Sequence, residues 1–423
     1  DDLKTWDLIL NKGIKFSHGA ELTADDVIYN FKELWMHPDT TSTLKRTFGA
    51  YLKKENIEKI DRYTVRLHLD SAQIIIPEHL AMNQAAILPK DYDGKFIDNP
   101  VGTGPYTLEE YIPDERCVLK RREGYWRNGS DGKALPYLDG LRFVNVGTEV
   151  SAMTAALSSG QVHVNRVYPA YLDLLKGTDI VVGGKPSGGT NVIRMRADKA
   201  PFDNIKVRQA LKAAMNRQLM FRNIMRGYGE LGEDFHVSPV HPEYAKIGDP
   251  PKQDIALAKK LLAEAGYPNG LDITLTIQNS DPYPTMAQIL KASFKQAGIN
   301  CTIEMVPTSV YWDRWMDIDF GITSWGPRPL GIQALNLAYK TGGPWNETHW
   351  SHPEFDKLLE KANGILDATE RSKVMAKLET IMQNEGPIMI PYWNPYMYGH
   401  SPKVKNYQFG ADDLMRLDSV WLD

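Results

Sequence analysis

Hydrophobic positions along the chain follow the periods of helices and strands in alternation. A helix is predicted for "AELTADDVIYNFKELW", because Val27, Phe31 and Leu34 fall on one face and Thr23 stands where an N-cap is expected. A strand is predicted for "YTVRLHLDS", which alternates with a period of two. Strand, helix and strand follow one another in "DITLTIQ", "SDPYPTMAQILKASFKQAG" and "INCTIEMV", with Gly298 ending the helix. This alternation is typical of α/β lobes.

Further helices are predicted on both sides of that unit. The helix of "GTEVSAMTAALSSGQVHV" stops at Gly160 and leads into a short strand. In "PFDNIKVRQALKAAMNRQLMFRNIM" the cap candidate Asp203 precedes one long apolar stripe that reaches Ile224. Two more helices, "HPEFDKLLEKANGILD" and "ATERSKVMAKLETIMQNEG", precede the apolar segment "PIMIPYWNPYMYG". The spacing of Trp312 and Trp315 predicts core packing on a helix.

Length and charge narrow the class of protein. A chain of 423 residues exceeds what one hydrophobic core usually organises, which predicts roughly two or three domains. The net charge is −4 with acids and bases well mixed, so neither a nucleic acid nor an anionic membrane surface is an expected partner. Cys117 and Cys301 are read as small buried side chains, and His349 and His352 as exposed loop histidines rather than metal ligands. We therefore expect neither a disulfide framework nor a metal.

The motifs of common enzymes are missing from the sequence. It contains no GxSxG elbow, no HExxH helix and no P-loop. The glycine pair of "GTGPY" lacks the third glycine and the following helix that a dinucleotide needs. A glycoside hydrolase would need two carboxylates at a defined separation, and no motif supplies such a pair, so it remains only a remote alternative. We expect a protein that is not an enzyme and has no cofactor.

Five blocks in a fixed order carry a resemblance to a known family. They are "GIKFSHGAELTADDVIYNFKEL", "NPVGTGPYTL", "LDGLRFVNVGTEVSAMTAALSSGQVHV", "APFDNIKVRQALKAAMNRQLM" and "AKKLLAEAGYPNG". Together with "HPEFDKLLEKA" and "PIMIPYW", they resemble the periplasmic solute-binding proteins of peptide, nickel and opine ABC importers, the extracellular solute-binding proteins of family 5. The resemblance implies an α/β, two-lobed periplasmic binding protein fold of class II, cluster C type, in which a hinge closes the lobes over a ligand.

The resemblance also implies a division of the chain. Lobe I would comprise residues 1–190, with an extra subdomain at 20–105; lobe II would comprise 191–392, and 393–423 would return to lobe I. The first strands of lobe I would be absent from this chain. The protein would be a periplasmic or lipid-anchored extracellular monomer that delivers its ligand to a membrane-embedded ABC permease. A chemosensing role for the same two-lobed clamp stays open.

The loop "GITSWGPRPLG" is the main candidate for ligand contact. Peptide-binding members of the family usually carry an aspartate in the segment equivalent to "SWGPRP", where it pairs with the α-amino group of the peptide. This chain has Trp325, Gly326 and Arg328 in that segment, and a guanidinium prefers carboxylate, phosphate or sulfate. We therefore expect a small carboxylate-bearing, anionic ligand, either an opine-like amino acid conjugate or a metal polycarboxylate chelate. A dipeptide or oligopeptide is the alternative.

Other candidate contacts are flat or charged side chains close to the two predicted crossings between the lobes, in "PSGGTNVIRMRAD" and "PYWNPYMYG". A closing site favours such groups because they bury area at a small entropic cost. A core role is the alternative for the tryptophans, and an ion pair with a surface acid is the alternative for the arginine, which shares a strand face with Arg196. The candidates are Trp345, Asn346, Trp393, Asn394, Tyr396 and Arg194.

Overall fold

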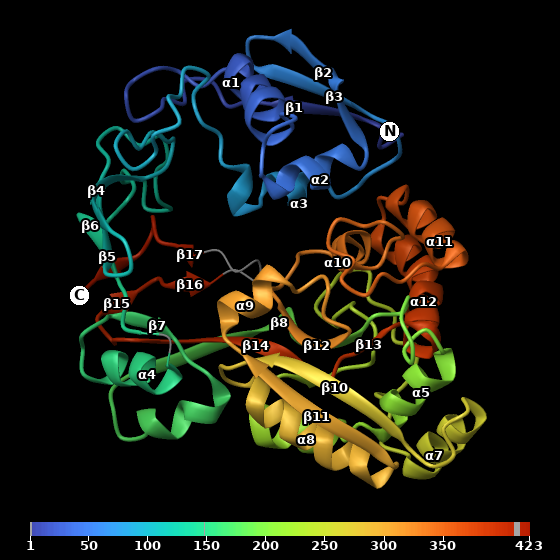
Figure 1. The fold of residues 1–423 in the computed structure, drawn as a ribbon. Helices are drawn as coiled ribbons and strands as arrows, with labels where there is room; N and C mark the ends of the chain where they lie inside the picture. The colour runs from blue at the N-terminus through green and yellow to red at the C-terminus, as the bar shows by residue number, and fades with distance from the viewer. Residues whose placement is uncertain (1, 148, 410–414) are drawn as a thin grey trace.

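The computed structural model describes residues 2–147, 149–409 and 415–423 of the chain. Figure 1 shows a small α/β unit at the top, strand-rich segments at the side and a larger α/β unit at the bottom. Residues 410–414 of the predicted return to lobe I lie outside the described residues. Within the part that is described, none of the helices combines the length and the apolar character that a membrane span requires.

The upper unit, which we call the N-terminal subdomain (residues 2–90), is a three-stranded antiparallel sheet with helices on it. The sheet order is β1-β3-β2, and β3 lies where the alternating pattern predicts a strand. Thr23 begins the first helix as predicted, and the Asp26 carboxylate accepts a hydrogen bond from its backbone N–H at 2.8 Å. The elements are β1 (Thr5–Ile9), α1 (Ala24–Tyr29), the π-helical η1 (Asn30–Trp35), α2 (Thr43–Gly49), β2 (Leu52–Asp61), β3 (Thr64–Leu69), α3 (Ile76–Leu80) and η2 (Asn83–Ala85).

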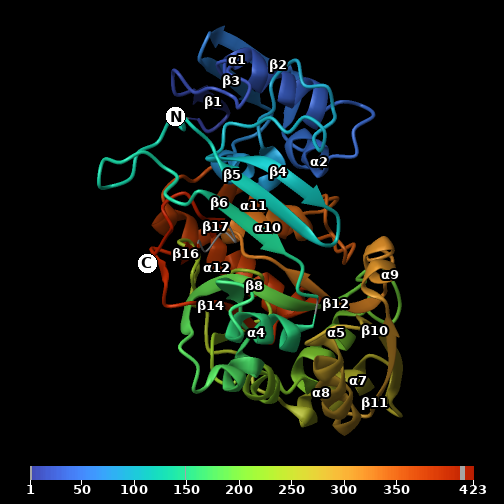
Figure 2. The same cartoon turned by 90° about the vertical axis from the view of Figure 1, so that its left-hand side faces the viewer.

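A second antiparallel sheet, β4-β5-β6, lies beside this subdomain and is seen face-on in Figure 2. Short elements follow it, and the end of the chain adds four strands of two residues each that pair as β15 with β18 and β16 with β17. The bounds are β4 (Tyr106–Ile112), β5 (Arg116–Arg121), β6 (Gly140–Val144), α4 (Val150–Ser158), β7 (Val164–Arg166), η3 (Pro169–Leu175), β15 (Val404–Lys405), β16 (Gln408–Phe409), β17 (Met415–Arg416) and β18 (Trp421–Leu422).

The largest sheet organises the lower unit, with the order β11-β10-β12-β8-β14-β7. Strands β10, β11 and β12 are parallel, so their carboxyl ends share one edge. In open α/β sheets this edge is where ligands usually bind. The strands are β8 (Val181–Met195), β9 (Glu230–Leu231), β10 (Leu271–Gln278), β11 (Ile299–Val306), β12 (Phe320–Trp325), β13 (Ile388–Met389) and β14 (Tyr392–His400).

Helices cover both faces of this sheet. On β8 the side chain of Val192 joins one apolar cluster and that of Ile193 joins another, as expected where alternate residues point to opposite faces. The helices are α5 (Ile205–Ala214), α6 (Arg217–Met220), the π-helical η4 (Phe221–Met225), α7 (Ile255–Glu264), α8 (Tyr283–Gln296), α9 (Thr308–Asp313), α10 (Gly331–Ala338), α11 (Pro353–Asn363) and α12 (Ala368–Glu385).

Strands β8 and β14 form a long ribbon from the two segments predicted as crossings. They pair antiparallel, with Trp393 opposite Thr190 and Pro395 opposite Pro186 and an irregularity between them. The β12 strand accompanies β8 only from Thr190 to Met195, so the rest of the ribbon extends past β12 to the end of the sheet that β7 forms. Two paired strands that connect two units are a suitable hinge, and the lobe boundaries at residues 190 and 392 stay predictions.

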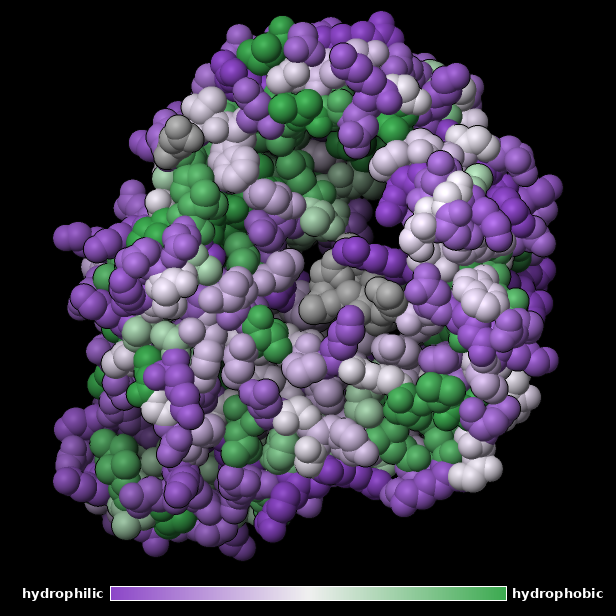
Figure 3. Space-filling model, turned by 180° about the vertical axis from the view of Figure 1, so that it is seen from behind, coloured by the Kyte–Doolittle hydropathy of each residue, from purple (hydrophilic) through white to green (hydrophobic). Residues whose placement is uncertain are grey.

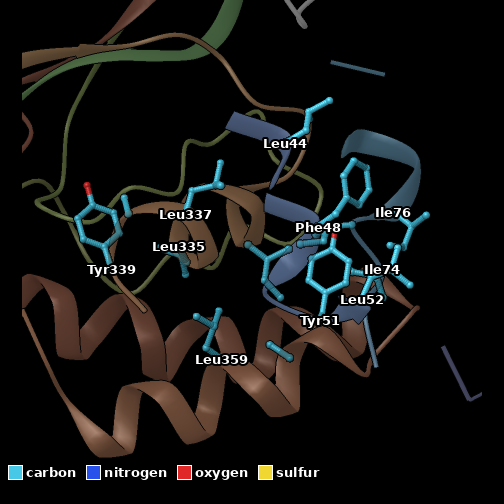
Figure 4. Close-up of a cluster of buried hydrophobic side chains, with 14 of the residues drawn as sticks. Leu44, Phe48, Tyr51, Leu52, Ile74, Ile76, Leu335, Leu337, Tyr339 and Leu359 are labelled. Carbon is cyan, nitrogen blue, oxygen red and sulfur yellow. The ribbon is translucent and has the colours of Figure 1, made fainter. Parts of the chain in front are cut away.

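A continuous apolar core joins the N-terminal subdomain to α10 and α11. Figure 4 shows Phe48 and Tyr51 of the subdomain beside Leu335 and Leu359, and all four are nearly inaccessible to solvent. Burying a side chain such as Phe48 stabilises this contact by about 1.5–3 kcal/mol. Viewed from behind, the surface is hollowed between the subdomain and the lower unit, with apolar side chains along the upper rim (Figure 3).

Three predictions about the helices are wrong. The cap of α5 is Asn204 rather than Asp203, since the Asn204 side chain accepts a hydrogen bond from the backbone N–H of Lys206 at 2.9 Å. A second cap, Asn216, divides the expected long helix, because its side chain accepts from a backbone N–H of the next turn and starts α6 there. Trp312 is 39% exposed rather than a core residue.

The cysteines and histidines follow the predictions in part. Cys301 is buried, whereas Cys117 is only half-buried. His349 is exposed, as expected, but His352 is half-buried and caps α11 by accepting from the backbone N–H of Phe355 at 3.1 Å. The position of His352 is therefore set by local capping of α11.

Candidate ligand site

The loop that carries Arg328 leaves the end of β12 and runs against β8. A Cβ atom added at Gly188 would lie 2.7 Å from His241 Nε2 and 3.6 Å from the Arg328 carbonyl oxygen, so only glycine permits this approach. The His241 Nδ1 atom accepts from the backbone N–H of Ser238 at 2.9 Å, which leaves Nε2–H to donate to the Arg328 carbonyl at 3.0 Å. Burial lowers the pKa of His241, and the neutral ring anchors the loop.

The guanidinium of Arg328 lies over the indole of Trp345. Its Cζ atom is 5.5 Å from the ring centroid, and Nη1 donates to the Pro327 carbonyl at 3.1 Å. Both side chains are half-buried, and Gly326 beside them is exposed. A cation–π contact of this kind contributes about 0.5–1 kcal/mol and orients the planar fork. The predicted anion receptor and a predicted aromatic contact thus lie together.

Behind this pair, Trp325 is fixed by a buried carboxylate. Its Nε1–H donates to Glu347 Oε1 at 3.0 Å, and Thr323 Oγ1 donates to Glu347 Oε2 at 2.7 Å. The same carboxylate forms an ion pair with Arg194, with Nε and Oε2 3.1 Å apart. The Trp325 and Trp345 ring centroids are 5.6 Å apart. Trp325 is 5% exposed, so it supports the platform from below rather than forming its surface.

Two buried histidines border this platform. His236 lies 5.1 Å from the Trp325 ring, and its Nδ1 is 2.9 Å from the Tyr339 hydroxyl. His79 of α3 comes from the N-terminal subdomain, and its Nδ1 is 2.6 Å from the Tyr51 hydroxyl. Burial, assisted by nearby positive charge that includes Arg328, lowers the pKa of each histidine to about 3. Both rings are therefore neutral at physiological pH and add no positive charge to that of Arg328.

Trp393 completes the aromatic cluster on the β14 side. It is 2% exposed, and its ring lies 5.9 Å from that of His236. Its Nε1–H is buried and finds no acceptor in the described part of the chain. A buried donor without a partner costs about 1–3 kcal/mol. The indole is thus mainly a core group. An acceptor for its N–H would stabilise the folded protein.

Two predicted contacts serve the interior instead. Arg194 is fully buried and, besides its ion pair with Glu347, donates to the carbonyls of Ile318 and Trp315. The expected alternative of an ion pair therefore holds, with a buried acid as partner rather than a surface acid. Asn346 is buried, and its amide donates to the Trp350 carbonyl at 2.8 Å, closing the turn around it. Both side chains therefore bond to other parts of the protein, and their contact with a ligand stays a prediction.

The last two candidates follow Trp393 along β14. Asn394 is half-buried, and its backbone carbonyl accepts from the hydroxyl of Ser187 at 2.7 Å. Tyr396 packs with its ring 4.9 Å from the guanidinium of Arg166, a residue that the sequence patterns did not single out. The structure therefore brings together Arg328, Trp325, Gly326, Trp345 and Trp393, and for Asn394 and Tyr396 a role in ligand contact stays a prediction.

Several residues of this site escaped the sequence analysis. Glu347 directly follows a predicted contact in "GGPWNETHW", but nothing in the sequence marked it as buried. His236 and His241 stand five residues apart in the turn-rich "EDFHVSPVHPEY", and that pairing was the available signal. His79 carries no local signal, because the fold alone brings it near Arg328.

Comparison with known proteins follows this geometry. A family model described as "Bacterial extracellular solute-binding proteins, family 5 Middle" matches residues 1–347. Heme-binding protein A of Haemophilus influenzae is 28% identical over 97% of this chain and 81% of its own length. The glutathione-binding protein GsiB of Salmonella typhimurium is 29% identical over 99% of this chain and 83% of its own length.

Solved structures share the fold over the whole chain. The periplasmic binding protein DppA from Helicobacter pylori, in complex with peptide STSA, superposes with a TM-score of 0.86 at 24% identity, covering 100% of this chain and 87% of that one. The binding protein AgaA from A. tumefaciens R10, in complex with agropinic acid, gives 0.85 at 21% identity with the same coverage. The fold is therefore the α/β fold of two-lobed periplasmic binding proteins.

Proposed function

The chain belongs to the bacterial extracellular solute-binding proteins of family 5, and from this premise we propose that it captures a small carboxylate-bearing solute by closure of its lobes. As a member of this family it is the substrate-binding component of an ABC importer, and its relatives are solute-binding proteins rather than enzymes. Family members are periplasmic and work with ABC permeases. The identity of the solute is the part we add.

The observation that carries the proposal is the Arg328 guanidinium stacked on Trp345 in the loop after β12. A planar guanidinium held on an aromatic ring can bind a carboxylate through two parallel, charge-assisted hydrogen bonds. The neighbouring histidines are neutral, so the positive charge of this loop resides on Arg328. Gly326 stands in the segment where peptide-binding relatives usually have an acid, which disfavours a free α-amino group as the primary contact.

The names of relatives are consistent with this class of ligand. Glutathione, named for one group of relatives, and agropinic acid, named for one solved structure, are both acids. An opine-like amino acid conjugate or a metal polycarboxylate chelate would present the required carboxylate. We place the hinge in the β8–β14 ribbon and expect a monomer in the periplasm or on a lipid anchor. A ligand favours the closed state only through contacts that form there, so both lobes must contribute.

A dipeptide or oligopeptide is the second candidate. The observation in its favour is that several relatives are named for peptides, including a dipeptide-binding protein of Pseudomonas aeruginosa that is 26% identical. In that case another acid would have to receive the α-amino group. The two candidates differ in the ligand group that binding requires, a free carboxylate or a free amine.

A thermal-shift screen separates them. The panels are opine-type conjugates, metal polycarboxylate chelates, glutathione, and peptides with free amino termini. Ligand at 100 times its dissociation constant adds about 2.7 kcal/mol of stability, a shift of a few degrees. For the carboxylate that binds, Arg328→Ala should weaken binding by more than about 2 kcal/mol, because a charge-assisted, partly desolvated pair is lost.

The matched control is Arg62→Ala, which removes an exposed arginine whose partner is Glu21 in the N-terminal subdomain. It should leave ligand affinity unchanged. An unchanged dissociation constant for Arg328→Ala, or stabilisation by peptides alone, would show that Arg328 is not the carboxylate receptor.

A further inference from the structure

A cavity of about 670 Å³ lies against one face of the β8–β14 ribbon. Pro395 pairs with Pro186 and Met397 pairs with Gly184, so these four residues share the face that forms the back wall of the cavity. One side wall comes from η3, and the other comes from residues 228–230, directly before and at the start of β9. Cavities of about 300–1,000 Å³ between parts of a fold are the usual sites for small molecules.

The side chains around this cavity are mainly apolar and are not fully covered. Leu172 and Leu175 of η3 line it together with Met397. Val182 and Tyr228 also line it, although they are 40% and 46% exposed. Covering such apolar surface removes it from water and gains about 25 cal/mol per Å². The cavity therefore favours a molecule with an apolar body.

The backbone keeps one side wall free of a bulky side chain at Gly229. This residue has a φ of +85°, and a Cβ atom added to it would lie 2.3 Å from the carbonyl oxygen of Trp393. Only glycine permits this approach to β14. Leu231 then pairs with Tyr392, which fixes the loop on the edge of β14. The shape of the cavity is thus set by the backbone, before any ligand arrives.

Two cations share one carboxylate beside the cavity. Asp173 of η3 is 2.8 Å from the Nζ atom of Lys176 and 2.5 Å from Nη1 of Arg226, so this group bridges η3 and the segment that precedes β9. Lys176 also lines the cavity. One carboxylate balances only one of the two cations, and the charges of Lys185 and Glu230, which line the cavity as well, balance each other. The side of the cavity at Lys176 therefore carries an excess positive charge.

We propose that this cavity is a second binding site, which takes a small molecule with an apolar, ring-containing body and one anionic group. The rings contact the leucines of η3 and Met397, and the anionic group lies at Lys176. The site is separate from the proposed carboxylate receptor, since neither Arg328 nor Trp345 is among the described residues that line the cavity. A molecule that contacts both side walls holds η3 and residues 228–230 at one separation.

The test uses the purified full chain and two fluorescent probes with the same ring system. The first probe is 8-anilinonaphthalene-1-sulfonate, and the second is N-phenyl-1-naphthylamine, which lacks the sulfonate. Val182→Trp fills the cavity. Its matched control is Val181→Trp, because Val181 is 45% exposed but alternates to the opposite face of β8.

Charge is tested by Lys176→Gln, with Lys199→Gln as the control, because Lys199 is an exposed lysine whose partner is Asp319. Arg328→Gln tests whether the probes occupy the proposed carboxylate receptor instead. Dissociation constants are measured by fluorescence titration at constant ionic strength. Melting points without probe report whether each variant remains folded.

Val182→Trp should weaken binding of both probes by about tenfold, because the added indole occupies the space of the rings. Lys176→Gln should weaken binding of the sulfonate by about threefold, as expected for a partly exposed charge pair, and leave the neutral probe unchanged. Val181→Trp, Lys199→Gln and Arg328→Gln should bind as the wild type does.

Equal affinities in folded Val182→Trp and Val181→Trp would overturn the cavity as a binding site. An unchanged affinity of Lys176→Gln for the sulfonate would overturn the requirement for an anionic group. A loss of binding in Arg328→Gln without a loss in Val182→Trp would place the probes at Arg328 and overturn the inference, while the proposed function of Arg328 would stand.

Discussion

Separating Arg194 from Glu347 should destabilise the protein without acting through a ligand. The two side chains are 0% and 2% exposed, and their Nε and Oε2 atoms are 3.1 Å apart. Glu347 also holds the indole of Trp325 and the hydroxyl of Thr323, and Arg194 donates to the carbonyl of Ile318. The perturbation is the pair of substitutions Arg194→Met and Glu347→Gln, made singly and together. Glutamine keeps an oxygen acceptor for Trp325 or Thr323.

The magnitude follows from the burial of both charges. Removing one partner of a buried ion pair leaves the other charge uncompensated, which costs about 3–5 kcal/mol. Each single variant should lose that much free energy of unfolding. The double variant contains neither charge, so its loss should be close to that of one single variant, which gives a coupling energy of about 3–5 kcal/mol.

The assay is urea unfolding followed by tryptophan fluorescence, with ligand affinity measured for each variant that is folded. Additive losses in the cycle would show that Arg194 and Glu347 do not depend on each other. A tenfold loss of affinity in Arg194→Met with a free energy of unfolding close to that of the wild type would refute the structural role. It would return Arg194 to the ligand contacts that the sequence predicted.

Two further predictions concern pH. His79 and His236 have a pKa of about 3 in the folded protein and of about 6.5 in the unfolded chain. As the pH falls, the unfolded chain is therefore protonated at these residues before the folded protein is. The free energy of unfolding should fall by about 2 kcal/mol per histidine between pH 6.5 and 5. Equal free energies of unfolding at pH 7.5 and 5 would contradict this, and His18→Gln, which changes an exposed histidine, is the control. Burial raises the pKa of Glu379 to about 9, so this carboxyl opposes folding increasingly as the pH rises above its pKa in the unfolded chain. Glu379→Gln should therefore add a few kcal/mol to the free energy of unfolding at pH 8. A lower free energy of unfolding in this variant at pH 8 would count against a protonated carboxyl.

Local patterns were sufficient to predict most of the regular elements. The strand of β3, the capped start of α1 and the glycine ends of α4 and α8 all depend on residues within one turn or one strand. The long helix over residues 203–224 failed for an equally local reason. An apolar stripe of helical period continues across Asn216, and only the side-chain hydrogen bond of Asn216 shows that a new helix begins there.

The loop of the candidate site could be predicted because it depends only on the local backbone. Glycines and prolines around Arg328 predict a loop that displays its side chain, and the structure agrees. Arg194 could not be judged in this way, because β8 is covered on both faces and alternation does not tell which face meets a ligand. The contact of Arg166 was missed because Tyr396, on which its guanidinium packs, comes from β14, far later in the chain.

The distribution of charge supports the proposal that the site binds an anion. The acid that accepts a hydrogen bond from Trp325 is Glu347, and its charge is matched by Arg194 inside the protein. The histidines beside the platform are kept neutral by burial. The charges of Glu347 and Arg194 are therefore paired inside the protein, and Arg328 is the basic residue of the loop. A ligand carboxylate placed there would gain a charge-assisted pair without competing with the ion pair of Arg194 and Glu347, so the framework that positions Trp325 stays intact when the ligand binds and leaves.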